Sequence, residues 1–135
     1  MSNQKHPDTR QVAIWVDHQE ALLVKFHNEQ LLREEEIDSS VDPHTHGGGW
    51  SQHRIEAHRH EQLKHFYDEI VEHLGSVDEI LILGPGQAKH ELRSRIERHK
   101  GLRGKVVDLI TTDKISEEQF IQEAEEYFSL HPLAS

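Results

Sequence analysis

Three short stretches in the first third of the chain carry a strand-like hydrophobic pattern: the first two alternate with polar residues and then run apolar, and the third is a weaker run rich in glutamate. These stretches cover residues 11–17, 21–26 and 31–37, and short polar turns separate them. A period of two is typical of β-strands, and short turns favour antiparallel neighbours. We therefore predict an antiparallel meander of three strands.

The pattern changes to a helical period after the next loop, which covers residues 38–52. Apolar side chains then recur on one stripe that ends at Gly75, a plausible helix stop: Leu63, Phe66, Tyr67, Ile70, Val71 and Leu74. This stripe predicts a long amphipathic helix from about Arg54 to Leu74.

The remainder of the chain carries two further strands and two further helices. Residues 79–83 form a run that is wholly apolar after Glu79, typical of a strand buried on both faces, and Gly84-Pro85-Gly86 ends it. We predict a helix from Ala88 to near Gly101, a strand over residues 105–110, and a closing helix that Ser116 caps.

This order of elements predicts the α/β class. Three antiparallel strands, then helix, strand, helix, strand and helix, fit a single ribonuclease H-like domain on a mixed five-stranded sheet, with right-handed crossovers. Residues 1–10 are polar and predict a flexible N-terminal tail. Residues 11–135 then form the domain.

Composition narrows the function classes. The 135-residue chain has no cysteine, leader or long apolar run, which favours a cytoplasmic protein without a membrane partner. Its net charge of −10 argues against field-driven binding to nucleic acid, DNA included. Residues 89–105 nevertheless form a basic island, either a solvated helix face or a surface that faces a ligand: Lys89, Arg93, Arg95, Arg98, Lys100, Arg103 and Lys105.

Candidate metal and catalytic residues give diffuse patterns. The chain has thirteen histidines, but no spacing typical of a zinc site, so we predict no metal and no cofactor. A histidine-rich metal-binding protein stays an alternative. A nuclease would need converging carboxylates, and the run over residues 79–83 has its acid at the wrong end, so Asp17 is expected to be a turn residue.

Two glycine-rich segments stand out. The turn at Gly84-Pro85-Gly86 opens a helix whose free amides, together with Lys89, suit a phosphate group, although a tight strand-to-helix turn is the favoured explanation. The loop His46-Gly47-Gly48-Gly49-Trp50-Ser51 contributes little to a core and predicts a mobile segment that presents backbone.

These motifs, in this order, resemble the middle domain of eukaryotic and archaeal class I peptide-chain release factors and their Pelota-like relatives, which include small bacterial translational machinery proteins. The resemblance covers almost the whole chain. It rests on the first hairpin, on the glycine loop that leads into the long helix, and on a strand-glycine-helix segment: residues 12–17 with 21–24, 46–51 with 53–55, and 83–92 with 102–106.

The resemblance implies a function on the ribosome. In that family a Gly-Gly-Gln loop enters the peptidyl-transferase centre, where a backbone amide of the glutamine assists hydrolysis of the peptidyl-tRNA ester. By position, Gly48 and Gly49 match the glycines, and Trp50 stands where the family has glutamine. Contacts to RNA or phosphate are expected from six residues: Arg54, Arg59, Gly86, Lys89, Arg93 and Arg95.

Two functions remain open from the sequence. One is a stand-alone factor that associates with the ribosome or tRNA in rescue or quality control, with or without ester hydrolysis. The other is a non-catalytic module that binds a protein partner or an anion. Trp50 separates the catalytic from the non-catalytic reading, because an indole is far bulkier than a carboxamide and can instead stack on a base.

Overall fold

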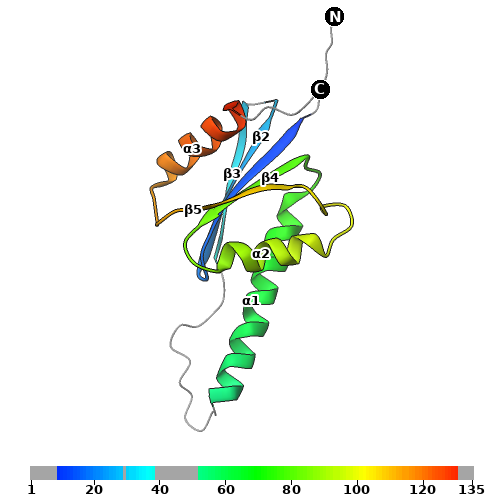
Figure 1. The fold of residues 1–135 in the computed structure, drawn as a ribbon, viewed down its shortest axis with the longest axis vertical. Helices are drawn as coiled ribbons and strands as arrows, with labels where there is room; N and C mark the ends of the chain where they lie inside the picture. The colour runs from blue at the N-terminus through cyan, green and yellow to red at the C-terminus, as the bar shows by residue number, and fades with distance from the viewer. Residues whose placement is uncertain (1–8, 29, 39–51, 131–135) are drawn as a thin grey trace, which may run out of the picture.

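The computed structural model describes residues 9–28, 30–38 and 52–130. In this part of the chain one open sheet carries helices on both faces (Figure 1). The elements are β1 (Arg10–Val16), β2 (Glu20–His27), β3 (Gln30–Asp38), α1 (Gln52–Leu74), β4 (Glu79–Gly84), α2 (Ala88–Glu97), β5 (Val106–Thr111) and α3 (Glu117–Leu130). The predicted mixed α/β fold, with three helices and a mixed sheet, is confirmed.

The sheet places β1 at its centre, in the order β3-β2-β1-β4-β5. β1 runs antiparallel to β2, with Ile14 opposite Leu23, and parallel to β4, with Ile14 opposite Ile82. Between β2 and β3 the register shifts at Lys25 and Phe26, and the shift leaves Leu32 65% exposed. The meander and the crossover strands therefore share a single sheet.

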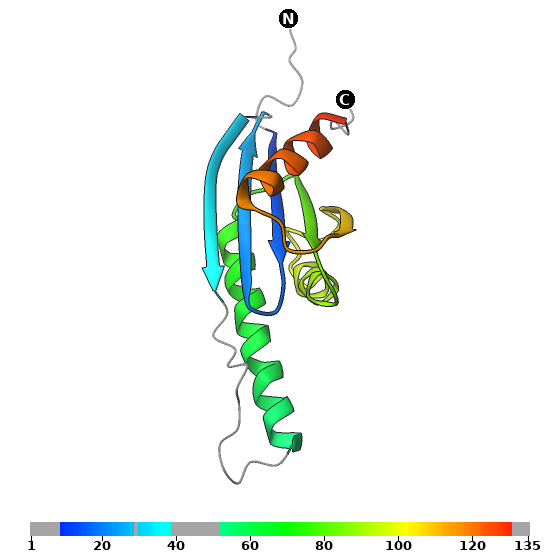
Figure 2. The same ribbon diagram turned by 90° about the vertical axis from the view of Figure 1, so that its left-hand side faces the viewer.

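Alternate residues of the central strands feed two hydrophobic cores. Val12, Ile14 and Val16 of β1 belong to the core under α1 and α2, whereas Ala13 and Trp15 belong to the core under α3. Figure 2 shows α3 in front of the sheet and α1 behind it. The strands at the centre are buried on both faces, as the continuous apolar run of β4 predicts.

The strand-to-helix turn after β4 depends on a close backbone contact. A Cβ atom on Gly84 would lie 2.1 Å from the carbonyl oxygen of Val16, and Gly84 has φ +148°. Only glycine allows β4 to end this near to β1. This contact sets where α2 begins.

The beginning of α3 agrees with its prediction, whereas the end of α2 does not. Ser116 caps α3 as expected, because its hydroxyl accepts the amide of Gln119 at 3.1 Å. The prediction that the second helix reaches Gly101 was wrong, since α2 ends at Glu97. The amides of Arg98 and His99 bond to carbonyls three residues back, at Arg95 and Ile96, which tightens the chain out of the α-helix.

Candidate functional site

The loop residues predicted to carry the chemistry, Gly48, Gly49 and Trp50, lie outside the described residues. Their position in the chain is nonetheless informative, because they directly precede α1, which begins at Gln52. The part of the candidate site that the structure describes therefore consists of α1 and the elements that hold it.

α1 extends well beyond the sheet. Figures 1 and 2 show its amino-terminal turns projecting from the body of the protein. In this projecting segment (residues 52–61) every side chain whose burial is described is exposed: Arg54, Glu56, Ala57, His58, Arg59, His60 and Glu61. A helix exposed on all sides is typical of a segment that contacts something other than its own core.

The remainder of α1 packs against the sheet. In this packed segment (residues 62–74) the predicted apolar stripe is buried, from Leu63 at 9% exposed to Leu74 at 2%. Ile70 in its middle is fully buried, and α1 ends beside Gly75, which has φ +61°. The packed segment thus anchors the projecting one.

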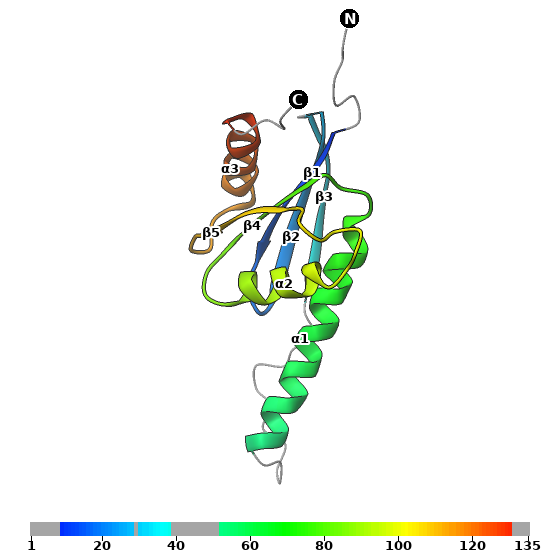
Figure 3. The ribbon, with the colours of Figure 1, turned by 45° about the vertical axis from the view of Figure 1, so that its right-hand side comes forward.

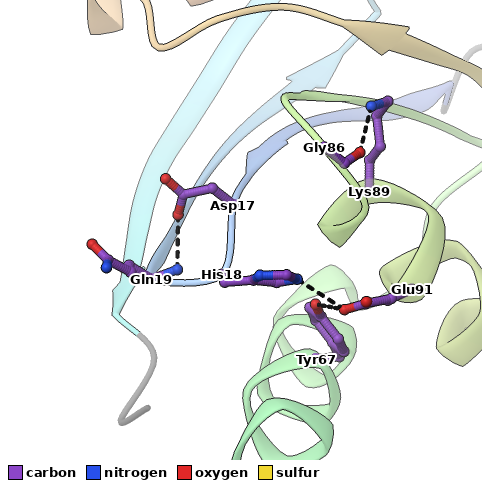
Figure 4. Close-up of polar contacts among 7 residues, drawn as sticks. All are labelled: Asp17, His18, Gln19, Tyr67, Gly86, Lys89 and Glu91. Carbon is purple, nitrogen blue, oxygen red and sulfur yellow. Dashed lines mark hydrogen bonds and ion pairs between the residues drawn. The ribbon is translucent and has the colours of Figure 1, made fainter. Parts of the chain in front are cut away.

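α2 lies across the same face, beside the middle of α1 (Figure 3). Its thin apolar stripe, which consists of Ala88, Leu92 and Ile96, is buried as predicted. Lys89 is also buried, at 3% exposed, and its Nζ donates to the carbonyl oxygen of Gly86 at 2.8 Å (Figure 4). This ammonium group closes the turn that opens the helix.

The six predicted basic-site residues fall into two groups. Arg54 and Arg59 are exposed on the projecting segment of α1. The others belong to α2 and to the turn between β4 and α2, where Gly86 and Arg93 are exposed, Lys89 is engaged as described, and Arg95 binds Asp68 of α1. Arg95 Nη2 donates to both carboxylate oxygens of Asp68 at 2.8 Å, so this arginine joins the two helices.

A polar network missed by the sequence analysis ties α1, α2 and the β1–β2 turn together. Tyr67 OH donates to Glu91 Oε1 at 2.5 Å, and His18 Nε2 lies 3.1 Å from the same oxygen (Figure 4). Burial and the hydrogen bond to Glu91 raise the pKa of Tyr67, so its hydroxyl remains a donor. A tyrosine on an otherwise apolar stripe signals such a partner, because a buried hydroxyl needs one.

Asp17 is a turn residue, as expected. Its Oδ1 accepts the amides of Gln19 at 2.8 Å and Glu20 at 2.9 Å (Figure 4). Glu79, the acid of β4, pairs with Gln11 at the opposite end of β1. The two carboxylates therefore do not converge, and across residues 9–28, 30–38 and 52–130 no three histidine or acidic side chains are placed to hold a metal ion.

Of the helices in the described ranges, none is both long and apolar enough to cross a bilayer.

The sequence of residues 7–127 matches the model of a known family, bacterial archaeo-eukaryotic release factor family 10. The chain belongs to this family. The predicted resemblance to release factors is thereby confirmed. No curated protein matches the chain.

Solved structures similar to this fold include release factors and Pelota proteins. The archaeal translation termination factor aRF1 is 16% identical, with a TM-score of 0.57 over 90% of this chain and 40% of its own. Thermoplasma acidophilum Pelota is 19% identical, with a TM-score of 0.58 over 91% and 35%. Dom34 of S. cerevisiae, a translation termination-like factor involved in RNA quality control pathways, is 12% identical, with a TM-score of 0.52 over 93% and 41%.

The chain thus spans between a third and a half of the length of these proteins. At these identities the likeness concerns the fold.

Proposed function

We propose that this family 10 protein works in translation as a factor that docks on the ribosome in rescue or quality control. The projecting segment of α1 and the Gly47–Trp50 loop before it form the docking end. In this proposal residues 11–135 act as one domain with a ribonuclease H-like fold. The protein works in the cytoplasm, where the ribosome is.

The exposed projecting segment is the observation that carries this proposal. Its side chains whose burial is described, Arg54 and residues 56–61, belong to neither hydrophobic core, yet the segment continues directly from the anchored part of α1. Arg54 and Arg59 are exposed on it, and the triple-glycine sequence precedes it in the chain. An extended helical arm is suited to a narrow RNA-lined recess, which a broad acidic body would not enter.

The narrower form of the proposal concerns peptidyl-tRNA. A backbone amide in a glycine-rich segment can approach an ester and stabilise a developing oxyanion. Because Trp50 stands in the glutamine position, we propose that its indole limits this approach and favours stacking on a nucleotide base. Ribosome binding and ester hydrolysis are therefore measured separately.

Co-sedimentation with bacterial ribosomes over a series of salt concentrations tests docking. Arg59→Glu should weaken binding about tenfold and make it less dependent on salt, because contacts to phosphate release counterions. Arg10→Glu is the matched control, since Arg10 is the exposed first residue of β1. In Figure 1, β1 begins at the end of the protein opposite the projecting segment. Equal loss in both variants, or binding unaffected by salt, would favour a module that binds a protein partner.

Release of peptide from ribosome-bound peptidyl-tRNA tests the narrower form. Trp50→Gln should release peptide faster than the parent, and Gly48→Ala, made in the Trp50→Gln background, should reverse that gain. A parent that releases peptide faster than Trp50→Gln would show that the indole is itself compatible with hydrolysis, and would overturn the assigned role of Trp50.

A further inference from the structure

The groove between α1 and α2 is a second feature, and of the docking end only His60 lines it. It encloses about 320 Å³, a size typical of small-molecule sites. From α1 it is lined by four residues whose spacing places them on one helix face: His60, Leu63, Lys64 and Tyr67.

The facing side of α2 has the same spacing but a different chemistry. Its lining residues are all polar: Glu91, Ser94, Arg95 and Arg98. The apolar stripe of α2 points instead into the core beneath it. Two helices that pack closely usually interdigitate apolar ridges, and here one helix supplies none at the contact, so the space between them stays open.

The polar side chains that line the groove differ in how firmly they are held. Tyr67 bonds to Glu91, and Arg95 binds Asp68 of α1, so these groups are fixed in place. Lys64 reaches Glu61 only at 3.7 Å in an exposed pair, which holds it weakly, and Arg98 is exposed. Lys64 and Arg98 are therefore the lining cations best suited to meet an anion.

We infer that this groove binds one nucleotide unit, with its phosphate between Lys64 and Arg98 and its base against the Leu63 and Tyr67 floor. The side chains of Glu91 and Ser94 offer hydrogen-bond partners for the base or the ribose. A nucleotide combines an anionic group with a flat, largely apolar ring. The groove combines two cations, an apolar surface on α1 and polar side chains on α2, so the two match in chemistry. The inference holds whether the nucleotide is free or part of an RNA strand, and its RNA form rests on the proposed function.

Calorimetric titration of the full chain tests the inference, with AMP, adenosine, inorganic phosphate and a single-stranded hexamer of adenylate as probes. We expect AMP to bind at least tenfold more tightly than adenosine or phosphate. Arg98→Glu should weaken AMP binding about tenfold, because it places a carboxylate at the phosphate. Ser94→Glu should weaken it to a similar degree, because a larger, charged side chain would occupy the place of the base or the ribose. Thermal unfolding checks that these exposed substitutions leave the fold intact.

Two control variants test whether the effect is specific to the groove, and the comparison of AMP with the hexamer identifies the source of the nucleotide. Ser129→Glu on α3 and Arg10→Glu on β1 introduce the same charges at exposed positions elsewhere and should leave AMP binding unchanged. Tighter binding of the hexamer than of AMP identifies RNA as the source, and the reverse identifies a free nucleotide. The inference is overturned if neither AMP nor the hexamer binds. It is also overturned if AMP binds Ser94→Glu as tightly as it binds the parent. Ribosome co-sedimentation of Ser94→Glu reports separately on the proposed function.

Discussion

The two segments of α1 differ in what holds them in place. The packed segment buries an apolar stripe against the sheet, whereas the projecting segment is exposed on every described side. Both belong to one uninterrupted helix of 23 residues. An isolated helix as short as the projecting segment is marginal in water, so its order depends on the part that is anchored.

This difference separates stability from function along a single element. Substitutions in the packed segment should lower the free energy of unfolding. They should affect ribosome binding by the docking end only through this loss of stability. Substitutions in the projecting segment should affect binding while the fold persists. The following predictions test that separation, in order of decreasing effect on stability.

The largest effect is expected at the centre of the packed segment. Ile70 is fully buried in the core under α1 and α2. Ile70→Ala should lower the free energy of unfolding by about 3 kcal/mol, because the cavity adds to the lost burial. Urea unfolding measures the change. Glu69→Ala, at the exposed neighbouring position, should change it by less than about 0.5 kcal/mol, and equal effects at the two positions would contradict this packing.

An intermediate effect is expected at Tyr67, which joins α1 to α2. Tyr67→Phe removes the donor to Glu91 and should cost about 1 kcal/mol of unfolding free energy. In a Glu91→Ala background the same substitution should cost clearly less, since the partner is already gone. A cost that is unchanged in that background would mean that the hydroxyl does not act through Glu91.

A smaller, pH-dependent effect is expected where α1 ends. His73 Nδ1 lies 3.3 Å and Lys25 Nζ 3.4 Å from Glu35 Oε1. Burial disfavours the charged carboxylate, but Lys25 and His73 outweigh it and hold the pKa of Glu35 below its ordinary value of 4.5. A lowered carboxyl pKa stabilises the fold above pH 4.5, and this contribution is lost as the pH falls through the lower, folded value.

Glu35→Gln should therefore destabilise the protein at neutral pH by up to about 1 kcal/mol, a difference that shrinks in acid. Urea unfolding at about pH 7 and about pH 3 measures it. Glu36→Gln, at the adjacent exposed position on β3, serves as the control. A difference between Glu35→Gln and the parent that grows in acid would contradict the assigned sign.

The smallest effect on stability is expected in the projecting segment. Arg59→Glu should change the free energy of unfolding by less than about 0.5 kcal/mol, because Arg59 is exposed. The same variant should lose ribosome binding as described above. Loss of stability together with loss of binding would remove the separation between the two segments.

Much of the fold could be predicted from the sequence, because hydrophobic period and glycine position act locally. The apolar run of β1 and the stripe from Leu63 to Leu74 each follow from one element's own residues. The end of α2 was harder to predict. Its last turn tightens through bonds between neighbouring backbone groups, and no side-chain pattern signals this.

The candidate site was less predictable, because its contacts join residues distant in the chain. Arg95 is 27 positions from Asp68, and Glu91 meets both Tyr67 and His18. Charge counting therefore identified a basic island without revealing that Lys89 and Arg95 are internally engaged. The assignments of Gly48, Gly49 and Trp50 stay predictions, since they lie outside the described residues.

Because α1 is one continuous helix, its length fixes the distance from the sheet to its amino-terminal tip. At 1.5 Å per residue its 23 residues measure about 35 Å, so residue count alone sets how far the tip stands from the sheet. Seven residues inserted between Glu56 and Ala57 would lengthen the reach by about 10 Å and leave the angular phase of the tip nearly unchanged. The reach of the tip can thus be changed without altering the sheet.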